Sequence, residues 1–298
     1  MNNNIKIAII GLGYVGLPLA IEFSKYYKII GFDHFAKRIN TLKYFKDNNN
    51  QFSKKDLKKS RIEFTNNEKD LKKANIYIIC VPTPVDNRKK PDLKNIIDAS
   101  KLVSKNIIKG NIVIYESTVY PGTTENICQP ILEKYSKLKC NRDFFIGYSP
   151  ERINPGDKIH TLPNIKKVVS ASNKNTLKKI YSLYSKIVKA GVYKAENIKT
   201  AEAAKIIENT QRDINIAFMN ELSIIFEKMS INTKEVINAA STKWNFINFK
   251  PGLVGGHCIG VDPYYLAYAS KEHGYNSNFI LSGRSINENA FKRVIKKI

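Results

Sequence analysis

The chain has 298 residues, carries a formal net charge of +23, and is 43% hydrophobic. A chain of this length can bury a large core and is long enough for two domains. No apolar run approaches the roughly 20 residues that a membrane-spanning helix needs, so the sequence predicts no membrane-spanning helix.

Lysine carries most of the positive charge: of the 49 basic residues, 8 are arginine and 41 are lysine. These lysines are spread over the whole chain. Proteins that bind nucleic acids usually concentrate their basic residues in one stripe, together with aromatic residues. We therefore expect no nucleic-acid partner, and we expect the charge to attract an anionic substrate.

Four cysteines are present, and their spacing is that of neither a zinc site nor a disulfide framework: Cys80, Cys128, Cys140 and Cys258. Thiols of this kind are typical of a reducing compartment. The N-terminal sequence MNNNIKIAII also lacks the pattern of a cleavable signal peptide. We expect a cytoplasmic protein without a bound metal.

Short apolar strands alternate with helices in the first part of the chain. We expect strands at 5–10, 28–32, 75–81 and 111–115, and helices at 15–26, 93–107 and 124–135. This alternation predicts an α/β fold, a Rossmann-like doubly wound parallel sheet with helices on both faces. The last strands of the sheet are expected at 144–148 and 167–171, and the lysine-rich segment 43–59 is expected to be exposed.

The second part of the chain is expected to be helical. After a helix at 175–188, residues 199–229 show helical apolar spacing with few breakers. This length exceeds that of most globular helices and predicts a central spine, which can also form a homodimer contact. The remainder is expected to be helical, with a loop at 246–260. The expected domains are a dinucleotide-binding domain at 1–196 and an all-helical central domain at 197–298.

Three glycines follow the first strand in the spacing G-x-G-x-x-G: Gly11, Gly13 and Gly16. In a dinucleotide-binding turn, the first glycine permits the tight turn and the second lets the backbone approach a pyrophosphate. The third lets the helix pack closely on the sheet, and the N-terminus of that helix attracts the phosphates. The alternative is a packing turn without a ligand.

Asp33 ends the second strand, 17 residues after Gly16. A carboxylate at this place accepts hydrogen bonds from the adenosine ribose and repels a 2′-phosphate, which favours NAD over NADP. Arg38 lies five residues further on. From its spacing alone, it either reaches the phosphates or is a solvated helix residue.

Thr83 and Thr118 follow the strands expected at 75–81 and 111–115. Both therefore lie at the carboxyl ends of strands, where ligands bind in open α/β sheets. Each hydroxyl can hold a nicotinamide, a ribose or a water. Taken singly, each is as well explained as an ordinary turn residue.

The segment KPGLVGGHCIGVDPYY at 250–265 holds a lone cysteine, Cys258, four residues before Asp262. A cysteine nucleophile needs a thiolate, and Asp262 could take a proton from the substrate. The glycines at 252, 255 and 256 would let the backbone wrap closely around a substrate. The alternative is a small buried cysteine. We expect no catalytic role for His257, because adjacent side chains rarely face each other.

The long helix carries four polar residues on one face: Glu202, Lys205, Asn209 and Arg212. Such a face is usually solvated, but Lys205 and Asn209 have apolar neighbours and are better candidates for an inward-facing site. An ammonium and an amide one turn apart could stabilise an oxyanion. In SPERINPGD, Glu151 is a candidate base and Arg152 a candidate anion contact.

Several motifs together resemble the UDP-glucose and UDP-N-acetyl-sugar 6-dehydrogenase family. They are GLGYVGLPLA, VPTPVD, ESTVYPGTTE, SPERINPGD, EAAKIIENTQRDINIAFMNEL and GGHCIGVDPYYL, and they cover nearly the whole chain in the order of the family. The resemblance implies a four-electron oxidation of the C6 alcohol of a nucleotide sugar to the uronate. Two NAD⁺ are used, and no free aldehyde is released.

The resemblance also implies a role for each matching residue. Cys258 forms a thiohemiacetal and then a thioester, Lys205 and Asn209 stabilise oxyanions, and Asp262 with a water on Thr118 transfers protons. Glu151 assists thioester hydrolysis. The implied cofactor contacts are Gly11, Gly13, Tyr14, Val15, Gly16, Asp33, Arg38, Thr83 and Thr118. The implied substrate contacts are Arg152, Lys205, Asn209 and the loop from Phe249 through Gly252 and Gly255 to Gly256.

Gly260, where many relatives have proline, lies in a segment that looks most similar to members oxidising UDP-N-acetylglucosamine or UDP-N-acetylgalactosamine for surface polysaccharide. UDP-glucose is the less favoured substrate. Family members continue into a third, UDP-binding domain, whereas this chain stops at Ile298. The alternative to an active enzyme is therefore a truncated remnant that binds NAD and dimerises.

Overall fold

The computed structural model describes residues 5–153, 157, 159–256 and 259–295. The chain divides into two compact units. The first contains Met1–Thr83 and Leu93–Lys205, and the second contains Pro84–Asp92 and Ile206–Ile298. None of the helices described is long and apolar enough to cross a membrane.

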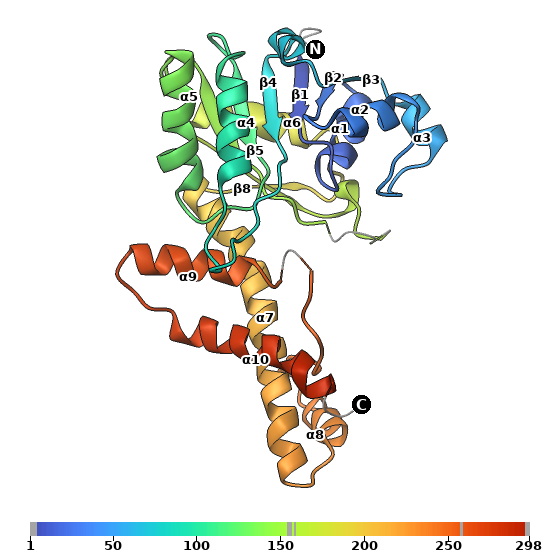
Figure 1. Ribbon diagram of the computed structural model, residues 1–298, viewed down its shortest axis with the longest axis vertical. Helices are drawn as coiled ribbons and strands as arrows, with labels where there is room; N and C mark the ends of the chain where they lie inside the picture. The colour runs from blue at the N-terminus through green and yellow to red at the C-terminus, as the bar shows by residue number, and fades with distance from the viewer. Residues whose placement is uncertain (1–4, 154–156, 158, 257–258, 296–298) are drawn as a thin grey trace. The chain divides into compact units, whose positions relative to one another are not determined.

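The first unit is built on one eight-stranded sheet with the strand order β3-β2-β1-β4-β5-β6-β7-β8 (Figure 1). Its strands are β1 (Lys6–Ile10), β2 (Lys28–Phe32), β3 (Ile62–Thr65), β4 (Ile76–Ile79), β5 (Ile112–Tyr115), β6 (Phe145–Tyr148), β7 (Lys167–Ala171) and β8 (Val192–Lys194). The six strands from β3 to β6 pair in parallel. This order reverses direction at β1, which is the topology of a doubly wound sheet, as predicted.

Helices connect these strands and cover both faces of the sheet. They are α1 (Gly16–Ser24), α2 (Ala36–Lys43), α3 (Lys54–Lys59), α4 (Lys94–Ser104), α5 (Gln129–Ser136) and α6 (Lys174–Tyr184), with shorter turns η1 (Glu68–Lys73), η2 (Thr124–Cys128) and η3 (Leu162–Asn164). Successive residues of a strand point to opposite faces. Ile7 and Ile9 accordingly pack in one apolar cluster with α1 and α6, while Ala8 and Ile10 pack in a second cluster with α4 and α5.

Strand β7 departs from the parallel pattern. It runs antiparallel to β6, with Tyr148 opposite Ser170, and it pairs in parallel with β8. The start of an antiparallel strand lies beside the end of its neighbour. Lys167, the first residue of β7, therefore lies at the edge of the sheet where β5 and β6 end.

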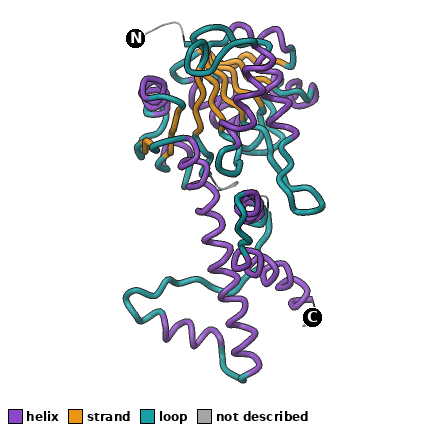
Figure 2. Tube along the Cα trace, turned by 90° about the vertical axis from the view of Figure 1, so that its left-hand side faces the viewer, coloured by secondary structure: helices purple, strands orange, loops and turns teal. Residues whose placement is uncertain are grey.

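Helices make up the second unit, and none of its described residues belongs to a named strand (Figure 2). Helix α7 (Ile198–Lys228) has 31 residues and passes from the first unit into the second. It confirms the long helix that the sequence predicts. The others are α8 (Thr233–Ala240), α9 (Asp262–Glu272) and α10 (Asn278–Ile295).

One loop from the first half of the sequence, Pro84–Asp92, belongs to the second unit. The two ends of this loop are hydrogen-bonded, because the Asp92 N–H donates to the Pro84 carbonyl at 2.8 Å. The hydroxyl of Tyr265 in α9 also donates to this carbonyl, at 3.2 Å. The chain therefore passes between the two units three times, at 83–84, 92–93 and 205–206. The sequence, by contrast, predicts a single boundary after residue 196.

The segment 43–59 is mostly exposed, as the sequence predicts, but two of its side chains are buried. Leu57 in α3 is completely buried in the apolar cluster beside α1, and Asp47 is buried too. Lysines dominate the composition here because α3 has one buried apolar position and exposes the rest. The segment packs through these two side chains and keeps its lysines in solvent.

Candidate functional site

The glycine-rich turn between β1 and α1 is shaped by two glycines that cannot carry a side chain. Gly11 has a φ of +91°, and a Cβ on it would lie 2.7 Å from the carbonyl oxygen of Cys80. A Cβ on Gly16 would overlap the carbonyl oxygen of Gly11. By contrast, a Cβ on Gly13 would meet nothing within 4 Å. The fold thus requires glycine at positions 11 and 16, and it leaves open space beside Gly13.

Asp33 lies at the end of β2 beside this turn. Its carboxylate is buried and accepts the N–H of Leu12 at 2.9 Å and that of Phe35 at 3.0 Å. These bonds join the end of β2 to the glycine turn and fix the direction of the carboxylate. Each oxygen keeps lone pairs for a ligand hydroxyl.

Arg38 on α2 is not the solvated helix residue that its spacing left open, because only 13% of its side chain is exposed. Its Nε donates to the Leu12 carbonyl at 3.0 Å, and its Nη1 donates to Asp47 at 2.9 Å. Its Nη2 is buried and has no hydrogen-bond partner in the described part of the chain. A buried guanidinium nitrogen without an acceptor suits an anionic or hydroxyl-rich ligand.

A cavity of about 860 Å³ opens over these groups. It is lined by residues that include Gly11, Gly13, Asp33, Arg38, Cys80 and Pro82. Ligand pockets commonly enclose roughly 300–1,000 Å³. The cavity, the open space at Gly13 and the unpartnered Nη2 of Arg38 together fit a dinucleotide. Tyr14 is exposed and Val15 is half-buried at the start of α1.

The two threonines predicted at the ends of strands do come together. The Thr83 hydroxyl donates to the Thr118 carbonyl at 2.6 Å, and the Ser117 hydroxyl donates to the Val81 carbonyl at 2.7 Å. These bonds tie the loops after β4 and β5 to each other. The loops form one polar rim at the carboxyl edge of the sheet.

Glu151 lies at the same edge, within a buried group of charges. Its Oε1 accepts the N–H groups of Arg152 at 2.6 Å and Ile153 at 2.8 Å, and its Oε2 lies 3.3 Å from Nζ of Lys167. Nζ of Lys167 also donates to Glu116 at 2.5 Å. Lys167 is not among the site residues predicted from the sequence, because a lysine at the start of a strand is normally solvated.

Burial affects how this group titrates. Desolvation raises the pKa of Glu116 to about 7, although Lys167 and the hydroxyl of Tyr184 both favour its charged form. Burial opposes the charge of Lys167, but the adjacent Glu116 and Glu151 outweigh it and raise the pKa of Lys167. Lys167 thus stays charged between two carboxyl groups.

Glu202 on α7 has a structural role instead of a place in the candidate site. Its carboxylate accepts the N–H of Gly122 at 2.5 Å and that of Thr124 at 2.9 Å, at the start of η2. A negative charge stabilises a helix N-terminus in this way. Burial nevertheless raises the pKa of Glu202 to about 7.

In the second unit, Asn209 and Asp262 meet. Nδ2 of Asn209 on α7 donates to Oδ2 of Asp262, the first residue of α9, at 2.5 Å. Both residues are buried. Nη2 of Arg212 donates to Oδ1 of Asn209 at 3.2 Å, so that the amide of Asn209 is oriented at both ends. Of the four polar residues predicted on one face of the long helix, Glu202, Lys205 and Asn209 are buried and Arg212 is half-buried.

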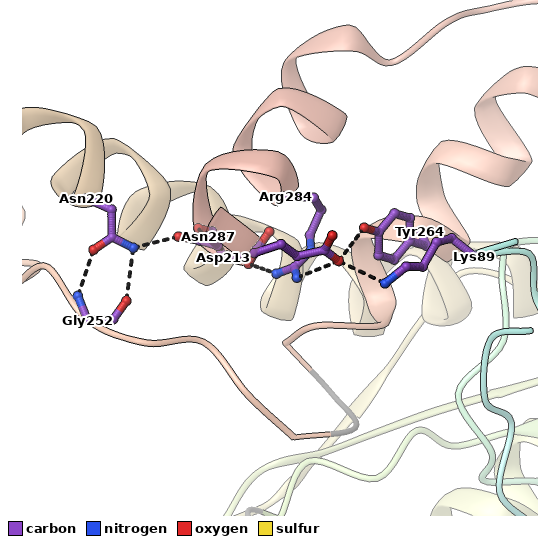
Figure 3. A network of polar contacts seen from close by, with 8 residues as sticks. Lys89, Asp213, Asn220, Gly252, Tyr264, Arg284 and Asn287 are labelled. Atoms are coloured by element: carbon purple, nitrogen blue, oxygen red, sulfur yellow. Dashed lines mark hydrogen bonds and ion pairs between the residues drawn. The ribbon is translucent and has the colours of Figure 1, made fainter. Parts of the chain in front are cut away.

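The loop that carries Gly252 is fastened to α7 by an amide. Oδ1 of Asn220 accepts the Gly252 N–H at 2.9 Å, and its Nδ2 donates to the Gly252 carbonyl at 2.9 Å (Figure 3). The same Nδ2 donates to Asn287 on α10 at 2.8 Å. Asn220 could not be predicted from the sequence, because its role depends on a loop residue 32 positions away.

Beside Asn287, a buried ion pair joins α10 to α7. Nη1 of Arg284 lies 2.5 Å from Oδ1 of Asp213, and Nη2 lies 3.3 Å from Glu288 (Figure 3). Glu288 in turn accepts hydrogen bonds from Tyr264 on α9 and from Lys89. This network joins α7, α9, α10 and the loop Pro84–Asp92.

Three further predicted residues lie in the described part of the chain. Arg152 donates through Nη1 to the Lys166 carbonyl at 2.8 Å, Phe249 is half-buried, and Gly255 is exposed. Cys258 and His257 lie outside the described residues. The first unit holds Thr118, Glu151 and Lys205, and the second holds Asn209 and Asp262.

A doubly wound sheet with a glycine-rich turn, joined to a helical unit by a long helix, defines an NAD-binding dehydrogenase architecture. Two family models match the chain: the NAD-binding domain of the UDP-glucose/GDP-mannose dehydrogenase family at residues 5–188, and its central domain at 199–289. The chain therefore belongs to the UDP-glucose/GDP-mannose dehydrogenase family, and its cofactor is NAD.

Individual relatives agree with this assignment. Protein CapL of Staphylococcus aureus is 57% identical over 298 residues, which cover 100% of this chain and 70% of CapL. The UDP-N-acetyl-D-glucosamine 6-dehydrogenase of Pseudomonas aeruginosa is 53% identical over 296 residues, covering 99% of this chain and 70% of that enzyme. The solved UDP-D-ManNAc dehydrogenase of Pyrococcus horikoshii superposes with a TM-score of 0.88 at 32% identity, covering 98% of this chain and 70% of that one.

Proposed function

We propose that this protein oxidises the C6 hydroxyl of a UDP-N-acetylhexosamine to a carboxylate, for use in a surface polysaccharide. The N-acetyl preference is supported by the 53% identity to the P. aeruginosa enzyme, which is named for UDP-N-acetyl-D-glucosamine. The observation that carries the chemistry is the buried hydrogen bond between Asn209 and Asp262. It supplies an oriented carboxylate in the unit whose sequence also contains Cys258.

The cofactor, NAD⁺, would accept one hydride in each of two oxidations. In the first, Asp262 takes the proton of the C6 hydroxyl through a water on Thr118, and the alcohol becomes an aldehyde. The Cys258 sulfur then bonds to the aldehyde carbon, which gives a thiohemiacetal. Lys205 and Asn209 stabilise the oxygen anion as this adduct loses a second hydride and becomes a thioester.

Water completes the reaction by attacking the thioester carbon. The carbon–sulfur bond breaks, its electron pair stays on the sulfur of Cys258, and the product leaves as the uronate. Glu151 accepts a proton from the attacking water. No redox change accompanies this last step, so the full reaction yields two NADH per sugar.

Contacts to the cofactor are proposed from the cavity in the first unit. The backbone around Gly11, Gly13 and Gly16 would approach the pyrophosphate, and Asp33 would accept hydrogen bonds from the ribose. The unpartnered Nη2 of Arg38 would donate to the same part of the cofactor. Tyr14, Val15, Thr83 and Thr118 are proposed contacts from their positions in the family motifs.

We also propose a homodimer through α7. Three large apolar side chains on this helix are exposed and share one face by their spacing: Ile207, Phe218 and Ile225. Exposed apolar side chains grouped in this way are typical of an interface. Sedimentation of the Phe218→Glu variant should show a smaller species than the unchanged protein, and an unchanged sedimentation coefficient contradicts the dimer.

The test of the enzymatic proposal measures NADH release with a panel of UDP-sugars. We expect two NADH per UDP-N-acetylhexosamine and a lower kcat/KM for UDP-glucose. The Cys258→Ser variant should not form the uronate. One NADH per sugar, or normal uronate formation by Cys258→Ser, would show that the proposal is wrong. Calorimetry that finds NAD binding but no UDP-sugar binding would favour a cofactor-binding protein without turnover.

A further inference from the structure

The buried charges around Glu151 form an ordered group whose members come from four parts of the first unit. Glu116 directly follows β5, Glu151 lies three residues after β6, Lys167 begins β7, and Tyr184 ends α6. Lys167 is 0% exposed. It reaches the edge where the parallel strands end only because β7 runs antiparallel to β6.

Glu151 is held from two directions. Two backbone N–H groups fix Oε1, and Nζ of Lys167 is the charged donor that faces Oε2, at 3.3 Å. A carboxyl group bonded on one oxygen can still pivot about that oxygen through small coupled changes of its side-chain torsion angles. A donor on the second oxygen therefore determines where the remaining lone pairs of Oε2 point.

Lys167 is itself fixed by its surroundings. Glu116 accepts a 2.5 Å hydrogen bond from Nζ, and the hydroxyl of Tyr184 donates to the other oxygen of Glu116. Nζ also lies 5.8 Å from the centre of the Tyr184 ring. The ammonium therefore has one defined position, and its contact with Oε2 fixes the orientation of the Glu151 carboxylate.

Stability is a weak explanation for this arrangement. Burying three ionisable groups costs desolvation free energy, which their mutual attraction only partly repays. Apolar residues at all three positions would fill the same space without that cost. The group also lies at the carboxyl edge of the sheet, where ligands bind in folds of this type.

We infer that Lys167, held by Glu116, is the positioning residue that aims the carboxylate of Glu151 at the water that hydrolyses the thioester. The inference rests on the proposed function, because it assumes that Glu151 takes the proton of that water. The step balances as written above: a carbon–oxygen bond forms, the carbon–sulfur bond breaks, and one proton moves to Glu151. Lys167 contacts neither substrate nor water and keeps its own proton throughout.

The test separates hydrolysis from the two oxidations. Lys167→Met is mixed rapidly with NAD⁺ and UDP-N-acetylglucosamine, and the first NADH burst and the later steady rate are both recorded. Misplacement of a reacting group by 1 Å can cost about 100-fold in rate. We expect a burst of two NADH per chain at the unchanged rate, followed by a steady rate reduced by up to about 100-fold. Mass spectrometry should find the acyl group on Cys258.

Three further variants make the result interpretable. Glu116→Gln/Lys167→Met removes one charge of each sign and should fold while showing the same slow hydrolysis. Any decrease in its hydrolysis rate beyond the decrease seen in Glu116→Gln alone is due to the loss of Lys167. Lys166→Met removes the exposed neighbouring side chain and should behave like the unchanged protein.

The inference is overturned if the folded double variant hydrolyses as fast as Glu116→Gln, or if burst and steady rate fall equally without an acyl adduct. A double variant that does not fold assigns Lys167 to stability and also overturns it. If the unchanged protein releases no NADH from any UDP-sugar, the proposed function itself fails, and the inference fails with it.

Discussion

Asn209 donates to Asp262 across the 53 residues that separate them in the chain, and this 2.5 Å hydrogen bond joins the middle of α7 to the first turn of α9. Asn209→Ala removes the donor from a buried carboxylate. We expect kcat to fall at least about tenfold, because removing a hydrogen bond to a charged group costs roughly 1.5–3 kcal/mol. The rate of NADH release at saturating substrate measures it.

Asn215 provides the matched control for this change, since it lies on the same helix with its amide bonded only to the Gln211 carbonyl among the contacts described. Asn215→Ala should leave kcat within about twofold. Equal activity of Asn209→Ala and Asn215→Ala would show that the bond to Asp262 has no part in turnover.

Alanine substitutions at two glycines of the turn should have different effects, one on stability and one on NAD binding. Gly16→Ala forces a Cβ into the carbonyl of Gly11 and should destabilise the first unit, which a lower melting temperature would show. Gly13→Ala meets nothing in the protein, so its melting temperature should be unchanged while NAD binding weakens. Calorimetry with NAD measures the second effect. Normal NAD affinity in Gly13→Ala would mean that the cofactor does not approach this turn.

The ion pair between Arg284 and Asp213 should be strongly coupled. Arg284→Met leaves a buried carboxylate without its cation, and such a loss costs about 3–5 kcal/mol of unfolding free energy. Asp213→Asn/Arg284→Met should recover part of that loss, because residue 213 is then no longer a buried carboxylate without its cation. Denaturant titrations measure both.

Arg293 serves as the control for this prediction, because its pair with Glu227 is much more exposed. Arg293→Met should cost no more than about 1 kcal/mol. Equal losses in the Arg284 single and double variants would contradict the assignment of the cost to an uncompensated charge.

Glu202 predicts a dependence of stability on pH. Its pKa is raised from 4.5 to about 7 in the folded protein, chiefly by burial. Its contribution to stability is therefore complete below about pH 4.5 and is lost as the pH rises through about 7. Glu202→Gln lacks this loss. Between pH 5 and pH 8, the variant should gain on the order of 2 kcal/mol relative to the unchanged protein.

Denaturant titrations of both proteins at several pH values test this expectation. A stability difference that stays constant from pH 5 to pH 8 would show that Glu202 does not take up its proton in this range. Glu116 titrates in both proteins and cancels in the comparison.

Elements with a strong local pattern could be predicted from the sequence. β1 and α1 combine a continuous apolar run with a fixed glycine spacing, and α7 has no breaker over 31 residues. β3 and β8 were missed, since they are short and lie toward the edges of the sheet. Their strand conformation depends on pairing with β2 and β7, which a local pattern does not contain.

The candidate site shows the same limit. Lys205 and Asn209 could be selected because their apolar neighbours predict an inward face. Lys167 could not, because its burial depends on Glu116, 51 residues earlier in the chain. Likewise, Arg284 meets Asp213 across 71 residues. Such pairs appear only when the fold brings separate elements together.

The loop Pro84–Asp92 has a practical consequence for dissecting the protein. It leaves the first unit after Thr83 and returns at Leu93, so neither unit is a continuous stretch of sequence. A fragment ending at Lys205 would expose this loop without the Tyr265 hydroxyl that donates to Pro84. Gene fusions that exchange one half between relatives must therefore transfer this nonapeptide together with the helices from 206 onward, or they will join mismatched parts.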